Sequence, residues 1–351
     1  MTDDKALRRY FSVLGFCLVL YVVVSNITGS FFLIGVMVVR LLRHPELLHG
    51  TPQALLGLIS GDPMLTLVVN TLAVYVISMP LIAYVIKKCL PRLPEQPQEA
   101  VTAEALPLPY ILMLAPVVLF LMEAGNLISL SLAGLAGRIT GLDPANTAVD
   151  SLISGEWWQT LLFVVILGPA AEELFFRKFL MDRVSPLGRH AAVMVSSITF
   201  ALFHQNLYQF FYAFFIGIVF AMVYVRTGRI LYSILIHMAV NLYGGMIRPW
   251  ALEGLLDLDE QALLQGGEAA VQALAGHAGP VIFLLCEGIV ALTGFICLIV
   301  FLVRGVCRLP RQVSDIPDTM LHRDFLTAPG MITFAVVCIG MGFVMIFARV
   351  V

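Results

Sequence analysis

Long apolar runs separated by short polar connections dominate the chain. A helix needs about 20 apolar residues to cross roughly 30 Å of hydrocarbon, and nine stretches reach or approach that length. They cover residues 11–39, 64–86, 108–133, 159–180, 190–205, 208–225, 230–247, 279–303 and 330–348. The pattern therefore predicts an all-α fold, a polytopic transmembrane helix bundle of about nine spans.

Two connections between these runs are longer than the others. Residues 139–157 join the third and fourth runs, and residues 249–278 join the seventh and eighth. The second connection has acidic residues among leucines, which is compatible with a short amphipathic helix lying on the outer surface. We favour the alternative, a solvated loop helix without a function. The proline-rich stretch 91–109 is interpreted as a linker. No internal repeat of the kind found in transporters is evident.

Composition supports a membrane protein. Hydrophobic residues make up 60% of the chain and charged residues only 13%, against roughly 25% charged residues in a soluble domain. The net charge of −2 gives no reason to expect a nucleic-acid partner. The six cysteines form no CxxC pair, so neither a disulfide framework nor a thiolate metal site is indicated. The charged N-terminus leads into an uncleaved first span rather than a signal peptide.

The placement of Lys and Arg predicts the orientation. With the N-terminus in the cytoplasm, most Lys and Arg outside the spans fall in cytoplasmic loops, as the positive-inside rule requires. An odd number of spans then puts the C-terminus outside. The chain has few long loops, which favours an integral protein of a bacterial cell membrane, surrounded by membrane lipids.

Two adjacent carboxylates, Glu172 and Glu173, end the fourth apolar run. Carboxylates at the edge of hydrocarbon are costly, which indicates a role in chemistry or ion handling. In a helix Glu173 and Arg177 are i and i+4 and can pair, while Glu172 projects about 100° away from Glu173. Pro169 should kink or open the helix just before them. The alternative is a charge cluster on the cytoplasmic surface.

The fifth and seventh runs add polar side chains to this candidate site. His204 ends the fifth run, and His237 and Asn241 are one helical turn apart on the seventh. Two imidazoles and a carboxylate, from His204, His237 and Glu172, can hold Zn²⁺ with an open position for water. The same groups can also act without metal, with Glu172 activating a water and His204 or Asn241 stabilising an oxyanion. The residue types alone do not choose between these mechanisms.

The predicted depths of these groups in the membrane differ. At ~1.5 Å per residue, full-length spans would leave Glu172 and His204 roughly 10 Å apart in depth. However, residues 191–225 are too few for two complete crossings. We therefore expect either that the turn at residues 205–209 lies within the membrane or that the fifth span starts above the cytoplasmic surface.

Three motifs in order resemble a known family. They are Glu172-Glu173-x-x-x-Arg177, Phe200-x-x-x-His204 and His237-x-x-x-Asn241, with about 30 residues between motifs. Residues 155–246, which contain them, resemble the CAAX prenyl endopeptidases and bacteriocin-processing or immunity proteins, called CPBP or Abi intramembrane proteases. The resemblance implies that Glu172 activates water, that His204, His237 and Asn241 complete the site, and that Glu173 and Arg177 support it. The family is described as metal-dependent, although a metal-free glutamate mechanism has also been argued.

The resemblance leads to an expected function and a division of the chain. The expected function is an intramembrane endopeptidase that cleaves a peptide or a lipid-anchored or membrane-anchored protein. The alternative is a non-proteolytic protein, either a proton-coupled transporter or a bacteriocin-immunity protein. Glu123 and Glu287, on the third and eighth runs, keep transport open, but we interpret both as packed, protonated carboxylates. The regions are an N-terminal membrane region (1–154), a core (155–246) and a C-terminal region (247–351).

Overall fold

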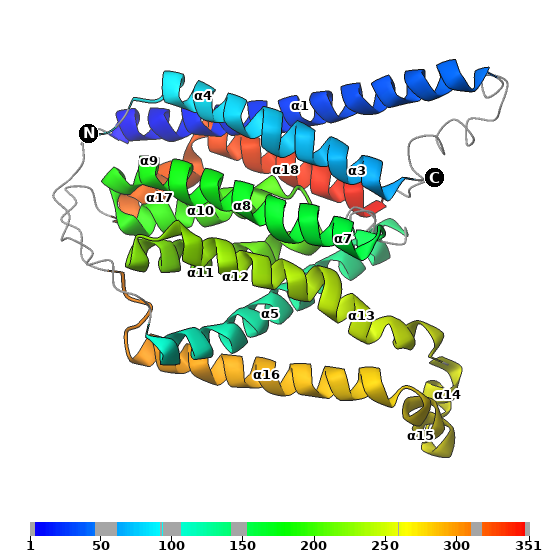
Figure 1. Ribbon diagram of the computed structural model, residues 1–351. Helices are drawn as coiled ribbons and strands as arrows, with labels where there is room; N and C mark the ends of the chain where they lie inside the picture. The colour runs from blue at the N-terminus through cyan, green and yellow to red at the C-terminus, as the bar shows by residue number, and fades with distance from the viewer. Residues whose placement is uncertain are drawn as a thin grey trace.

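The computed structural model, shown in Figure 1, describes residues 4–45, 62–91, 93, 107–141, 153–258, 260–309 and 318–347. Within these ranges the secondary structure is helical and contains no strand, which confirms the predicted all-α fold. Most of the predicted linker 91–109 and of the connection 139–157 lies outside the described residues.

Seven helices of the described chain are long and apolar enough to cross a membrane. They are Lys5–Arg43, Pro63–Cys89, Leu108–Thr140, Trp157–Leu187, Leu207–Thr227, Ile230–Leu255 and Ala278–Val303. A pair of helices bent by 59°, Met320–Thr327 and Pro329–Met345, gives an eighth if it counts as one span. The chain is therefore an integral membrane protein with a polytopic helical bundle.

The ninth predicted span differs from the others. It is helix α10 (Arg189–Phe203), which is apolar but has only 15 residues. At ~1.5 Å per residue this helix is about 22 Å long, shorter than the ~30 Å of hydrocarbon. All nine apolar segments are thus helices, but α10 is too short to cross the membrane alone.

The N-terminal helices form the first three segments of the bundle. Helix α1 (Asp4–Arg43) is followed by a second segment made of α3 (Pro63–Asn70), the π-helical η2 (Thr71–Ser78) and α4 (Met79–Cys89). Asp62 caps α3, since its carboxylate accepts a hydrogen bond from the Leu65 amide at 3.1 Å. The third segment is α5 (Leu108–Thr140).

The fourth segment alternates between helix types. It consists of α7 (Trp157–Gln159), π-helical η3 (Thr160–Leu167), α8 (Gly168–Glu173), π-helical η4 (Leu174–Met181), α9 (Asp182–Val184) and the 3₁₀ turn η5 (Ser185–Leu187). Helices α10, α11 (Leu207–Thr227) and α12 (Ile230–Leu242) follow, and α12 continues into π-helical η6 (Tyr243–Ile247). These elements, with the turn after α10, carry all the motif residues.

The predicted amphipathic connection is helical but is broken into short pieces. These are α13 (Arg248–Leu252), the 3₁₀ turn η7 (Glu253–Asp257), α14 (Glu260–Gln265) and α15 (Gly267–Gly276). The chain then returns through α16 (Ala278–Val303), α17 (Asp318–Thr327) and α18 (Pro329–Phe347). Helix α1 begins at one end of the bundle and α18 ends at the other (Figure 1). Which end faces the cytoplasm stays a prediction.

Helices distant in sequence pack tightly around the motif-bearing segment. The first and last long helices, α1 and α18, lie side by side (Figure 1), and α5 packs against both α11 and α16. Gly15 of α1 lies against the backbone of Gly330, and Gly294 of α16 lies against the backbone of Pro116. Small residues at such crossings let membrane helices approach closely. The main buried apolar cluster joins side chains from α1, α4, η4, α10, α17 and α18.

Candidate active site

The fourth segment changes its hydrogen-bond spacing just before the two carboxylates. The Gly168 amide donates to the Phe163 carbonyl, a π-type bond spanning five residues. The next residue is Pro169, which has no N–H and cannot donate to the Val164 carbonyl. The side-chain nitrogen of Asn241 donates to that carbonyl instead, at 2.9 Å. The expected opening at Pro169 is therefore a π-helical segment, a feature frequent at functional sites. Asn241 supplies the hydrogen bond that the Val164 carbonyl cannot receive from Pro169.

Glu173 and Arg177 form the predicted ion pair. The distance between Arg177 Nε and Glu173 Oε2 is 3.1 Å, and both side chains are fully buried. Arg177 also donates to Ser196 Oγ at 2.7 Å, and its guanidinium lies 4.7 Å from the centre of the Phe200 ring. Because the pair is enclosed, the alternative of a surface charge cluster is wrong.

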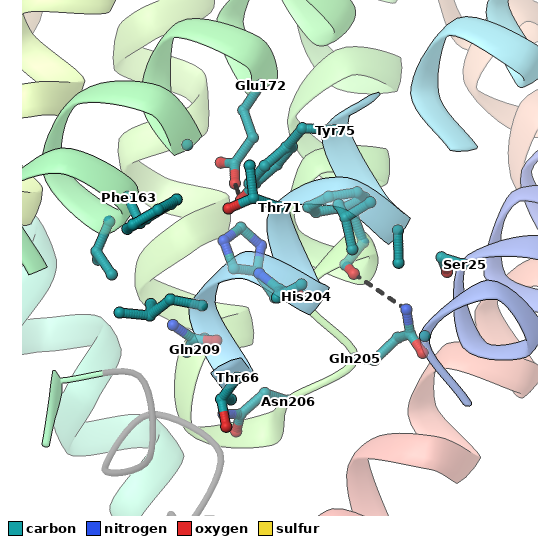
Figure 2. Close-up of a pocket in the computed structure, with 18 of the residues that line it drawn as sticks. Ser25, Thr66, Thr71, Tyr75, Phe163, Glu172, His204, Gln205, Asn206 and Gln209 are labelled. Atoms are coloured by element: carbon teal, nitrogen blue, oxygen red, sulfur yellow. Dashed lines mark hydrogen bonds between the residues drawn. The ribbon is translucent and has the colours of Figure 1, made fainter. Parts of the chain in front are cut away.

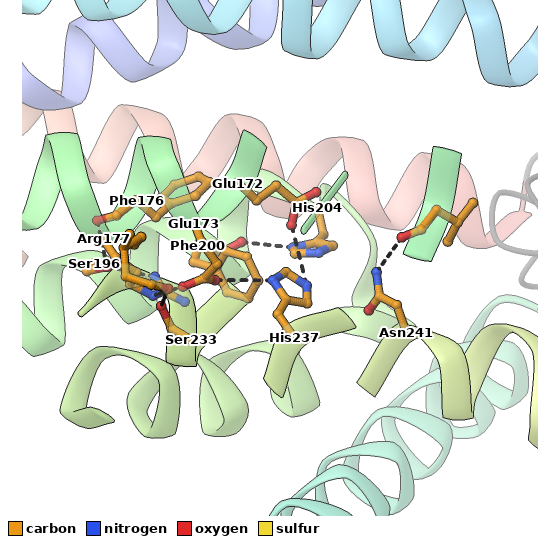
Figure 3. Close-up of polar contacts among 12 residues, drawn as sticks. Glu172, Glu173, Phe176, Arg177, Ser196, Phe200, His204, Ser233, His237 and Asn241 are labelled. Carbon is orange, nitrogen blue, oxygen red and sulfur yellow. Dashed lines mark hydrogen bonds and ion pairs between the residues drawn. The ribbon is translucent and has the colours of Figure 1, made fainter. Parts of the chain in front are cut away.

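His237 lies between the two glutamates (Figure 3). Its Nδ1 is 3.1 Å from Glu173 Oε1, and its Nε2 is 3.7 Å from Glu172 Oε2. A buried carboxylate beside Nδ1 favours the tautomer with the proton on that nitrogen. In that tautomer the lone pair of Nε2 faces Glu172.

A tyrosine from the second segment holds the other oxygen of Glu172. Tyr75, on η2, donates from its hydroxyl to Glu172 Oε1 at 2.6 Å (Figure 2). This distance is at the short end of the range for hydrogen bonds between oxygen atoms. Glu172 is only 6% exposed. Its two oxygens therefore have different neighbours, Tyr75 on one side and His237 on the other.

His204 lies in the turn that follows α10 and reaches the same cavity. Its Nδ1 is 2.8 Å from the Phe200 carbonyl, and because a carbonyl can only accept, the proton is on Nδ1 in the neutral ring. The next residue, Gln205, has a φ of 49°, the only positive φ outside glycine in the described chain. Such strain is common where a functional side chain must be held in place. Asn206 then caps α11 by accepting from the Tyr208 amide at 2.9 Å.

The short α10 explains how His204 meets Glu172. Because this helix ends at Phe203, the turn after it lies within the bundle rather than at its far end (Figures 1 and 2). The predicted difference in depth does not arise. The position of the turn relative to a membrane surface stays a prediction.

One cavity brings the candidate residues together. It has a volume of about 730 Å³, and Glu172, His204, His237 and Asn241 all line it. This volume falls within the usual range for ligand pockets. The remaining wall comes from α1, α3, η2, η3, α8, α10, the turn after α10, α11 and α18. The fully buried Glu173 and Arg177 lie behind His237, consistent with the supporting positions expected for them.

Metal binding by Glu172, His204 and His237 is a separate question. These side chains are of the right chemical type for Zn²⁺. However, among the described residues no group of three His, Cys, Asp or Glu side chains is placed so that it could hold a metal ion. In this arrangement the three side chains do not form a metal site. Zinc ligation by them stays a prediction.

Two other intramembrane acids lie beside one arginine. Glu287 and Glu123, expected to be packed, protonated carboxylates, both lie near Arg248, and their protonation stays a prediction. Arg248 Nε is 2.9 Å from Glu287 Oε1 and 3.9 Å from Glu123 Oε1, and Tyr243 also donates to Glu287. The Arg248 guanidinium lies within ion-pair distance of both carboxylates. This ion-pair cluster ties α5, α13 and α16 together.

Fold and site together define a class of protein: polytopic helical membrane proteins with a buried glutamate–histidine site inside the bundle. Within this class, residues 154–243 match a family model described as type II CAAX prenyl endopeptidase Rce1-like. The chain is also 34% identical over 110 residues to the membrane-embedded CAAX protease MroQ of Staphylococcus aureus (strain USA300). No solved structure matches the chain.

These matches confirm the predicted resemblance: residues 154–243 are similar to the CAAX-type membrane proteases. The match covers 29% of this chain and 44% of the length of the MroQ protein. The family model includes Glu172, His204 and His237 but not Tyr75. The division of the chain into three regions stays a prediction.

Tyr75 is the contact at the candidate site that the sequence did not reveal. It precedes Glu172 by 97 residues and stands in an apolar run without any motif. Tyrosines are common in membrane helices, so its presence there gives no signal. Only the packing of η2 against α8 shows that its hydroxyl reaches the carboxylate.

Proposed function

We propose that the chain is an intramembrane endopeptidase that hydrolyses a peptide bond in a peptide or a lipid-anchored or membrane-anchored protein. The observation that carries the proposal is the setting of Glu172. One of its oxygens accepts from Tyr75 at 2.6 Å, and the other lies 3.7 Å from His237 Nε2. Both face a cavity large enough for a polypeptide segment. The similarity of residues 154–243 to a membrane protease family supports this proposal.

The gap between Glu172 and His237 suits a water molecule. A separation of 3.7 Å is too long for a direct hydrogen bond, and two polar groups at such a distance are commonly bridged by water. Glu172 Oε2 and the lone pair of His237 Nε2 would each accept one proton of that water. The oxygen lone pair is then free to attack the carbonyl carbon of the scissile peptide.

Residues of this chain can carry out each proton transfer that the hydrolysis needs. As the water attacks, Glu172 takes its proton, and a tetrahedral intermediate forms at the carbonyl carbon. Asn241 uses one amide hydrogen on Val164, so its second one is available for the oxyanion. His204 can donate from Nε2 only as an imidazolium. Glu172 then passes its proton to the leaving nitrogen, and the products are a carboxylic acid and an amine.

A comparison of membrane-associated peptides tests this function. Mass spectrometry should find cleaved peptides in cells that carry the wild type and not in cells that carry Glu172→Gln, a nearly isosteric change. Glu268→Gln, at an exposed glutamate of α15, is the matched control and should resemble the wild type. If wild type and Glu172→Gln gave the same peptides, the protease assignment would be wrong.

A further inference from the structure

The cavity extends well beyond the residues proposed to carry out the chemistry. From Glu172 and His204 it continues along the turn after α10 to Gln205 and Asn206 (Figure 2). Ser25 and Asn26 of α1, together with α3 and η2, form the wall on that side. Much of this extension therefore comes from helices outside the segment that matches the family model.

The wall of the cavity is rich in amides and poor in charge. Among the described residues that line it, there is no Lys or Arg, and Glu172 is the only Asp or Glu. Amide side chains, in contrast, come from α1, α3, α11, α12 and the turn after α10. They are Asn26, Asn70, Gln205, Asn206, Gln209 and Asn241.

This chemistry matches a polypeptide backbone that is not helical. A side-chain amide carries both donors and acceptors, as a peptide group does. Inside a membrane, backbone that is not helical must find such partners within the protein. Asn26 Nδ2 and Gln205 Oε1 are 3.5 Å apart, at the upper limit for a hydrogen bond. Such a contact can be exchanged for a bond to a peptide at little cost.

A carboxylate fits the same wall poorly. No cationic side chain among the described lining residues can pair with it, and the Glu172 carboxylate lies in the same space. Arg177 cannot serve, because it is fully buried and paired with Glu173. A carboxylate brought into the cavity would lose its hydration and gain no counter-charge.

We propose that the cavity binds an uncharged, unwound internal segment of a polypeptide, and that it rejects Asp, Glu or a free terminal carboxylate next to the scissile bond. The inference rests on the proposed endopeptidase function, because it names the substrate class of that site. It assigns recognition to the amides of the extension and chemistry to Glu172 and the histidines.

Matched peptides test the selectivity directly. The probes are two quenched fluorogenic decapeptides built from Ala, Leu and Asn, which differ by one central Asn or Asp, and the full-length protein is reconstituted in liposomes. Because Asn and Asp have nearly the same shape, a difference reports charge. The kcat/KM for the Asn peptide should exceed that for the Asp peptide at least ~30-fold. Fluorescence anisotropy should likewise show tighter binding of the Asn peptide.

A charge variant ties the selectivity to this cavity. Gln209 and His204 line the same cavity. The substitution Gln209→Lys should lower the Asn-to-Asp ratio of kcat/KM at least ~10-fold, whereas the neutral Gln209→Met should leave this ratio unchanged. Equal binding of both peptides, binding of neither, or an unchanged ratio in Gln209→Lys would overturn the inference. Selective binding without cleavage would instead overturn the proposed function and leave the selectivity of the cavity standing.

Discussion

At the scale of single residues, the two adjacent glutamates are separated by their neighbours. Glu173 is enclosed with Arg177 and holds Nδ1 of His237. Glu172 faces the cavity, with Tyr75 on one oxygen and Nε2 of His237 near the other. The sequence predicted this division from helical spacing alone. The Tyr75 hydrogen bond could not be predicted, because no periodicity relates two residues on different helices.

Tyr75 should act as a positioning residue for Glu172. The change Tyr75→Phe keeps the ring and removes the hydroxyl, so Glu172 loses the bond that fixes one oxygen. A hydrogen bond to a charged group contributes about 1.5–3 kcal/mol, which corresponds to a fall in kcat of roughly 10- to 100-fold. Steady-state kinetics should show this fall with little change in KM, because the hydroxyl acts through Glu172 rather than on the substrate.

Tyr84→Phe is the matched control for Tyr75→Phe. Tyr84 lies on α4 of the same segment and is 60% exposed, so its variant should retain wild-type kcat. A Tyr75→Phe protein that raised KM and left kcat unchanged would show that the tyrosine contacts substrate instead.

At the scale of elements, Pro169 and Asn241 are linked through one backbone carbonyl. Pro169 leaves the Val164 carbonyl without a helical partner, and Asn241 from α12 supplies the hydrogen bond at 2.9 Å. The sequence predicted that Pro169 would open the helix and that Asn241 would face the site. It could not show that the second feature compensates for the first, since that depends on how α12 packs against η3.

This link predicts a non-additive pair of substitutions. Asn241→Leu in the wild type leaves a partly buried carbonyl without its partner and should reduce the free energy of unfolding by about 1 kcal/mol. In a Pro169→Ala background the restored N–H can bond the helix itself, so Asn241→Leu should cost clearly less. Thermal unfolding of the four proteins in one detergent measures the coupling. Additive effects would mean that the proline and the asparagine act independently.

At the scale of the whole molecule, the apolar pattern predicted the helices well. Each of the nine apolar segments is a helix, since a run of apolar residues in lipid must satisfy its own backbone. Contacts between segments were not predictable in the same way. Arg248 lies in a connection expected to be outside the membrane, yet it pairs with Glu287 and Glu123. Such pairing depends on how α5, α13 and α16 meet.

The short α10 makes a prediction about the membrane as a whole. A cysteine placed at Asn206, in a variant without the native cysteines, should react poorly with a bulky impermeant thiol reagent added from either side of sealed vesicles. Asn206 is only 6% exposed, and we expect its turn to lie inside the hydrocarbon. Gln272→Cys, on the exposed surface of α15, is the control and should react readily from one side. Rapid labelling at position 206 would contradict a turn within the membrane.

The wall of the cavity formed by α1, α3 and η2 has an evolutionary consequence. The proposed reacting groups lie in residues 154–243, whereas Tyr75 and two of the six lining amides, Asn26 and Asn70, lie in the first 89 residues. Mutations in these N-terminal helices can therefore alter which polypeptide is accepted while the reacting groups stay the same. Related chains would diverge in substrate first through the part of the sequence that carries no motif.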